Sequence, residues 1–144
     1  MSFDRVQRAS EGRKYGDTNE AHVLGVWAVY EIFQQANMYP VKGFLTKFDQ
    51  TFLAWNTNKG LTFDQWLLDL VAFKEPYFTV ENQEQDPDYI VEVDGEKHDK
   101  RPVQINDGIV KEWCRYRYPK AKFVRINKYD CAYPDFVKGK LGLK

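Results

Sequence analysis

The sequence predicts a single α+β domain in which a small mixed β-sheet is flanked by helices. The chain has 144 residues, the usual size of one domain, and its 43% hydrophobic and 16% aromatic content can form a core. Apolar residues recur at helical spacing before residue 75, whereas later segments are rich in aromatic and β-branched residues. A further helical pattern separates the last two strand-like segments, so we expect a crossover connection and a mixed sheet.

We expect residues 18–75 to form a helical part of the domain. Its first helix covers about residues 17–37, because Asp17 and Glu20 have the spacing of a capping box in front of a long apolar run. His22 lies inside that run, so we interpret it as a core histidine.

Two aromatic-rich helices should follow, over residues 42–60 and 62–75. In the first of them, Phe44, Phe48 and Phe52 are spaced four residues apart. In the second, the stretch "TFDQWLLDL" begins with a capping-box pattern and continues with apolar residues at helical spacing. We expect both helices to contribute mainly to the core.

The second half of the chain should form a compact αβ unit over residues 76–127, followed by a basic tail over 128–144. Its expected elements are strands at 76–81 and 88–95, a helix at about 107–118 and a strand at 121–127. The first two strands should pair as a hairpin, because a polar, turn-like stretch separates them.

Charge is balanced overall but unevenly distributed. The chain has 21 basic and 21 acidic residues. Residues 62–99 contain eleven acidic and two basic side chains, a net charge of −9, and residues 111–144 contain ten basic and three acidic ones, a net charge of +7. This pattern indicates either a metal site beside a polyanion-binding face or two halves that neutralise each other.

Two cysteines, Cys114 and Cys131, do not make a disulfide framework, which favours a reduced, cytoplasmic protein. We find no signal-peptide pattern and no apolar run near the roughly 20 residues that span a bilayer. The cysteines and the two histidines lack the spacing of a zinc site.

The stretch "IVEVDGEKHD" over residues 90–99 begins as a strand and ends in a dense group of ionisable side chains. In a strand, Glu92 and Asp94 point to the same face, Gly95 permits a sharp turn, and His98 follows within reach. Paired carboxylates are the oxygen ligands that Mg²⁺ prefers, and an imidazole can act as a general base. The alternative is an exposed hairpin end whose charges only interact with solvent.

The block "IVEVDGEKHD…RPVQINDGIVKEWCRYRYPKAKFVRI" resembles the very-short-patch-repair-type nucleases of the PD-(D/E)XK superfamily. The matching features are a strand bearing "EVDG", a histidine four residues after its Asp, an Asp opening a helix, and a strand similar to "VLRI". The resemblance covers about residues 78–127. It implies a restriction-endonuclease-like core and a metal-dependent endonuclease acting on DNA.

The resemblance also implies roles for individual residues. Glu81 and Asp94 would bind Mg²⁺ or Mn²⁺, with Glu20, near the start of the first helix, or Glu92 as a further ligand. His98 would activate or position the attacking water, and Asp107 would orient His98 or hydrogen-bond to a metal-binding residue. Glu81 takes the place of an acidic residue on the preceding strand, for which Asp88 is a competitor. The expected phosphate-binding residues are Arg115, Arg117, Lys120, Lys122 and Arg125.

The chain departs from the superfamily pattern at two places. Asp94 stands where a lysine is usual, and Lys97 or Lys100 could substitute for that lysine. About 35 additional residues, with the two aromatic-rich segments, separate the first helix from the hairpin. The alternative function is therefore a non-catalytic protein that binds nucleic acid or, like phage-type regulators, docks on another protein.

Overall fold

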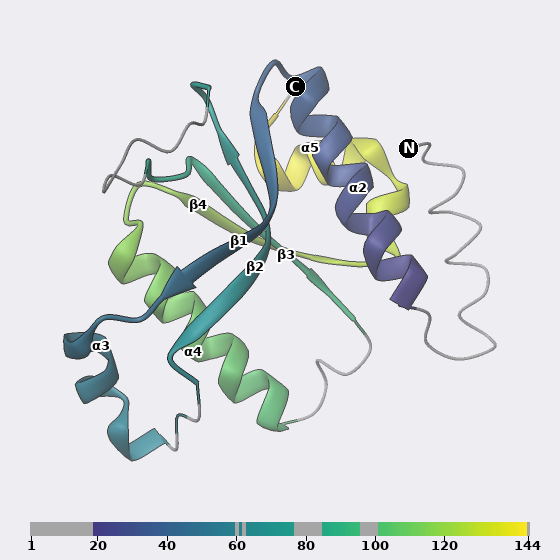
Figure 1. The fold of residues 1–144 in the computed structure, drawn as a ribbon. Helices are drawn as coiled ribbons and strands as arrows, with labels where there is room; N and C mark the ends of the chain where they lie inside the picture. The colour runs from purple at the N-terminus through teal and green to yellow at the C-terminus, as the bar shows by residue number, and fades with distance from the viewer. Residues whose placement is uncertain (1–18, 60, 62, 77–84, 96–100, 144) are drawn as a thin grey trace.

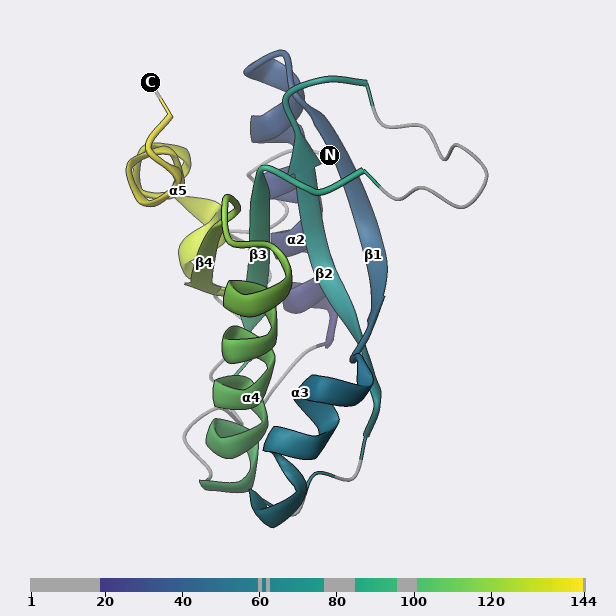
Figure 2. The same ribbon diagram turned by 90° about the vertical axis from the view of Figure 1, so that its left-hand side faces the viewer.

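The computed structural model describes residues 19–59, 61, 63–76, 85–95 and 101–143. Their framework is a four-stranded mixed sheet with the spatial order β1-β2-β3-β4, visible nearly edge-on in Figure 2. The strands are β1 (Tyr39–Lys47), β2 (Gln65–Phe73), β3 (Tyr89–Asp94) and β4 (Lys122–Asn127). Strand β2 is antiparallel to both β1 and β3, whereas β3 and β4 are parallel. The expected mixed sheet in an α+β fold is therefore confirmed.

Helices cover both faces of the sheet (Figure 1). They are α2 (Asn19–Gln35), α3 (Gln50–Trp55), α4 (Arg101–Arg117) and α5 (Pro134–Leu141), with the 3-10 turns η2 (Thr57–Lys59) and η4 (Asp130–Ala132). One core joins α2, η4 and α5 to one face of the sheet, and a second core joins α3 and α4 to the other. No helix in the described part of the chain is long and apolar enough to cross a membrane.

Four predicted elements are confirmed. The helix after residue 17 is α2, the strands expected at 88–95 and 121–127 are β3 and β4, and the helix between them is α4. Helix α4 begins at Arg101, six residues earlier than expected. Pro102 does not prevent this start, because a proline in the first turn of a helix lacks only an N–H that would have no intrahelical partner.

The helix expected over residues 42–60 is wrong. This segment contains the end of β1, then Asp49, which caps the short helix α3 by accepting a hydrogen bond from the Phe52 N–H at 2.8 Å. Phe44 and Phe48 are both buried on the α4 side of the sheet. A spacing of four residues places two side chains on one face in a strand as well as in a helix, so the pattern was ambiguous.

The prediction of a helix over residues 62–75 is also wrong, because this segment contains β2, one of the two inner strands of the sheet. Residues 70–73 of this strand are fully buried, since helices cover both faces of the sheet there. A strand buried on both faces is a continuous apolar run without alternation. The antiparallel partner of β3 is β2, and residues 77–81 of the strand that was expected in that place lie outside the described residues.

The segment expected as a basic tail over residues 128–144 contains η4 and α5. Val137 and Leu141 of α5 are buried against the α2 side of the sheet. Gly142 ends this helix in the left-handed conformation, with φ of 72°, which favours glycine.

One buried hydrogen-bond network ties β1 to α4. The Thr46 hydroxyl accepts a hydrogen bond from the Trp113 indole N–H at 2.8 Å and forms another with the Tyr118 hydroxyl at 2.9 Å. Both partners are almost completely buried, so Thr46 satisfies polar groups that have no access to water.

Candidate functional site

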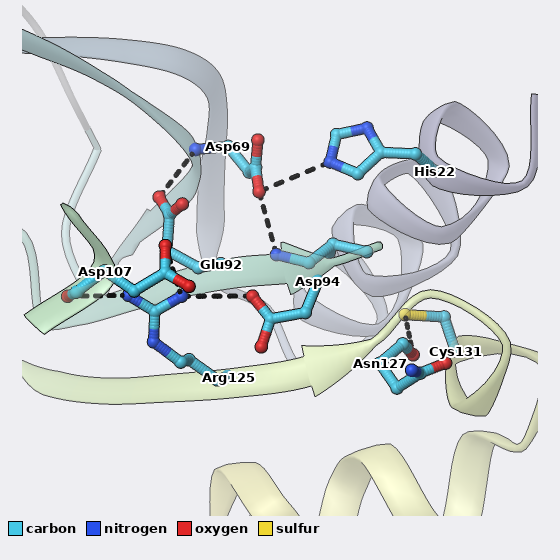
Figure 3. Close-up of polar contacts among 9 residues, drawn as sticks. His22, Asp69, Glu92, Asp94, Asp107, Arg125, Asn127 and Cys131 are labelled. Carbon is cyan, nitrogen blue, oxygen red and sulfur yellow. Dashed lines mark hydrogen bonds and ion pairs between the residues drawn. The ribbon is translucent and has the colours of Figure 1, made fainter. Parts of the chain in front are cut away.

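The candidate site lies where β2 and β3 separate. Their backbone pairing extends from Ala72–Tyr89 to Leu70–Val91 and then stops. Beyond it, side chains take over the pairing: the Asp69 N–H donates to Glu92 Oε1 at 3.1 Å, and the Val93 N–H donates to Asp69 Oδ2 at 2.8 Å (Figure 3). At this fork, each of the two strands therefore donates a backbone N–H to a carboxylate of the other strand.

A break in strand alternation aims Asp69 into the fork. Leu68 and Val71 both pack in the core on the α4 side, although residues three apart in a regular strand face opposite sides. On the neighbouring strand β1, Gly43 has φ of 67° between the residues that pair with Leu68 and Leu70. Such irregularities change the direction of side chains in a sheet, and here they change the direction of the Asp69 side chain.

Glu92 is a buried carboxyl with unusual electrostatics. Only 6% of the residue is exposed. Burial, and then the negative charge of Asp69, raise the pKa of Glu92 to about 8, although the Asp69 N–H and the Arg125 guanidinium favour its ionised form. A cation bound at the fork would compensate the free-energy cost of an ionised Glu92, which comes from its burial and from the charge of Asp69.

Arg125 links two further acidic residues beside the fork. It stands opposite Glu92 on β4, and one of its guanidinium nitrogens lies 3.0 Å from Asp94 Oδ1 and 3.5 Å from Asp107 Oδ1. Its other terminal nitrogen donates to the Asp107 carbonyl at 3.0 Å. Arg125 thus compensates Asp94 and Asp107 together and ties β4 to both β3 and α4.

His22 completes the group from the α2 side of the sheet. Its Nε2 lies 3.4 Å from Asp69 Oδ2, and its side chain is 36% exposed, so the interpretation as a core histidine is wrong. The hydrogen bond with Asp69 raises the pKa of His22, burial opposes that rise, and a backbone hydrogen bond at Val93 adds to it. The contact with Asp69 therefore favours the protonated imidazole of His22.

The structure brings together some of the predicted site residues. Glu92, Asp94, Asp107 and Arg125 form one contiguous group (Figure 3). Glu20 is an exposed residue in the first turn of α2. The predicted ligand Glu81 and the predicted base His98 lie outside the described residues, as do Lys97 and Lys100.

The acidic residue on the strand next to Glu92 is Asp69, which sequence reasoning missed. The competitor Asp88 lies at the other end of β3, where it accepts a hydrogen bond from the Lys74 N–H at 2.7 Å. The available signal was one acidic residue inside the apolar run "WLLDLVAF". A lone carboxylate in a strand that is otherwise core is a candidate for function.

The predicted phosphate-binding residues do not gather around the carboxylates. Arg125 is part of the site, but Lys122 begins β4 opposite Tyr89, at the far end of β3 from Asp94. Arg117 pairs with Asp86 at 2.9 Å. The remaining two, Arg115 and Lys120, are exposed near the end of α4.

The carboxylates at the fork suit a hard cation. Among the described residues, no group of three or more His, Cys, Asp or Glu side chains is placed so that it could hold a metal ion. Mg²⁺, however, keeps several waters and is usually held by one or two carboxylates, a number that Asp69 and Glu92 supply. Comparisons with protein-family models, curated proteins and solved structures found no match to this chain.

Proposed function

We propose that this protein is a metal-dependent endonuclease that hydrolyses phosphodiester bonds in DNA, with its site at the Asp69–Glu92 fork. The observation that carries the proposal is a pair of carboxylates on adjacent strands, one of them buried and with a pKa near 8. A folded protein retains such an arrangement at a cost in stability, and strongly perturbed carboxyl groups concentrate at functional sites.

The position of Asp69 changes one residue assignment that the resemblance to the very-short-patch-repair-type nucleases implies. That resemblance needs an acidic residue on the strand next to the "EVDG" strand, and Asp69 on β2 takes that place instead of Glu81. The mixed sheet, with α4 between the parallel strands β3 and β4, supports a restriction-endonuclease-like core.

Asp69 and Glu92 would hold the metal ion. A bound Mg²⁺ would polarise the phosphate and stabilise the negative charge that develops during hydrolysis. Among this chain's own residues, His22 holds Asp69 in orientation through Oδ2, and Arg125 holds Asp94 and Asp107 beside the fork. His98 keeps the water-activating role that the resemblance implies.

A non-catalytic binding protein is the second candidate, and the Asp94–Arg125 contact favours it. Asp94 stands where the superfamily usually has a lysine, and Arg125 neutralises it at 3.0 Å. If this ion pair only stabilises the sheet, the fork carries no reaction and the protein binds nucleic acid or another protein without cleaving it.

Plasmid nicking by the purified protein with Mg²⁺ or Mn²⁺ tests the proposal. Wild type should convert supercoiled to open-circular DNA, and Asp69→Asn should lose at least about 100-fold of that activity, because the metal loses a charged ligand. Asp88→Asn is the matched control, since it removes a charge at the other end of β3. Full activity of Asp69→Asn would refute the assigned site, and an inactive wild type would favour the non-catalytic alternative.

A further inference from the structure

A small apolar cavity adjoins the fork on the α2 side of the sheet. It has a volume of about 180 Å³ and lies between the first half of α2, the middle of β1 and the part of β2 that includes Asp69. Its walls are mostly hydrophobic, with Val23, Val26 and Leu67 among the lining residues. Binding sites for drug-sized ligands are roughly 300–1,000 Å³, so this cavity fits a single ring system.

One wall of the cavity is aromatic and carries a cation. The Trp27 ring lines it, and Lys42 Nζ lies 3.2 Å from the centre of that ring. None of the ion pairs between described residues involves Lys42, so its interaction with Trp27 is what holds its charge at the rim. A cation above an apolar cavity suits a ligand that has a flat ring and an attached anion.

The rim of the cavity exposes apolar surface that a ligand would cover. Val23 is 50% exposed and Leu67 is 59% exposed, on elements that face each other across the opening. Gly43 keeps the β1 side of the opening clear, because a Cβ added there would meet only Leu67 Cδ1, at 3.9 Å. Exposed apolar surface with polar residues at its rim is typical of binding sites.

The polar end of the cavity is the candidate site itself. Asp69 and His22 line the cavity, and the same Asp69 carboxylate accepts the Val93 N–H at the fork, next to Glu92 on β3. A strand of DNA that brought a phosphodiester to the fork would therefore carry the attached nucleoside past the mouth of the cavity.

We propose that this cavity binds one nucleobase of the DNA strand, with the base between Trp27 and Leu67 and a neighbouring phosphate on Lys42. The proposal rests on the endonuclease function above and makes its substrate more specific. A base that enters a side cavity must leave the base stack, so the substrate is single-stranded or locally unpaired DNA.

Nucleotide binding in EDTA, followed by NMR, tests the cavity without catalysis. Thymidine 5′-monophosphate should bind at least about tenfold more tightly than deoxyribose 5-phosphate, because contact between a base and an aromatic side chain contributes about this much. Equal dissociation constants for the two compounds would overturn the proposal.

Two pairs of variants locate the binding. Val23→Phe should fill the cavity and weaken nucleotide binding about tenfold or more, whereas Leu45→Phe, at a similarly exposed residue of β1 outside the cavity, should not. Lys42→Met should weaken binding of both phosphate compounds, whereas Lys47→Met should not. Unchanged binding by Val23→Phe, or equal losses within a pair, would refute the site, and the NMR spectra show whether each variant is folded.

Plasmid nicking separates this inference from the proposed function. A wild-type protein that nicks DNA but binds the two phosphate compounds equally retains the function and loses the cavity proposal. A protein that prefers the nucleotide but never nicks DNA retains the cavity as a nucleotide-binding site and loses the endonuclease.

Discussion

Replacement of Glu92 by glutamine should stabilise the metal-free protein at alkaline pH and change little at acidic pH. Folding raises the pKa of Glu92 from 4.5 to about 8, chiefly through burial and then through the charge of Asp69. Between these two values the folded state binds more protons than the unfolded state, so the stability of the wild-type protein falls as pH rises. The amide of the Glu92→Gln variant keeps an oxygen to accept the Asp69 N–H and carries no charge.

The size of the effect follows from the pKa difference. One pKa unit corresponds to 1.36 kcal/mol, and titration from pH 5 to pH 8.5 covers most of the interval between 4.5 and 8. The advantage of Glu92→Gln in the free energy of unfolding should therefore grow by about 4 kcal/mol over that pH range. The control Glu112→Gln changes an exposed carboxylate paired with Lys59, so it should show no comparable growth.

Urea unfolding in EDTA, monitored by tryptophan fluorescence at several pH values, measures this difference. A constant difference between Glu92→Gln and wild type from pH 5 to pH 8.5 would refute the assignment of a perturbed carboxyl to Glu92. Repeating the series with Mg²⁺ should reduce the difference at high pH, because a bound cation compensates the ionised carboxylate only in the wild-type protein.

Three further predictions concern the residues around the site and the core. Arg125→Met should destabilise the protein by about 3 kcal/mol in urea unfolding, because Asp94 and Asp107 lose the charge they share, and addition of Asp94→Asn to that variant should recover part of the loss. An Arg125→Met variant as stable as wild type would show that the ion pairs contribute nothing. Thr46→Val should cost about 2–4 kcal/mol, since the Trp113 and Tyr118 polar groups lose their buried partner, whereas Thr51→Val on the exposed surface of α3 should cost little. His22→Gln should destabilise the protein more at pH 5.5 than at pH 8, because a raised histidine pKa contributes stability below 6.5 that disappears as pH rises through the folded-state value; an equal effect at both pH values would contradict the His22–Asp69 contact.

Helix α4 and the short strands β3 and β4 could be predicted from the sequence. Helix α4 has a polar outer face, and β3 and β4 are short segments between clear turn residues, so the pattern predicted the helix and the two strands correctly. Strand β2 was not predicted, because helices cover it on both sides and its apolar run has no period of two. Because this segment was predicted to be a helix, Asp69 was not predicted to be a site residue.

The candidate site was only partly predictable for a related reason. Glu92 and Asp94 lie two residues apart on one strand, and local spacing is enough to place them together. The contact between Asp69 and Glu92 joins residues 23 apart in sequence, and it depends on where the β2–β3 pairing stops. His22 was assigned to the core because its helix is largely apolar, although the imidazole reaches Asp69 on β2.

Divalent-metal binding at Asp69 is the most direct test of the central claim. The melting temperatures of wild type, Asp69→Asn and Asp88→Asn should be measured at pH 7.5 over a titration with Mn²⁺. The melting temperature of wild type and of Asp88→Asn should rise with Mn²⁺ concentration to a plateau, and that of Asp69→Asn should not. A wild-type melting temperature that does not respond to Mn²⁺, or an Asp69→Asn variant that responds as wild type does, would contradict a metal site at the Asp69–Glu92 fork.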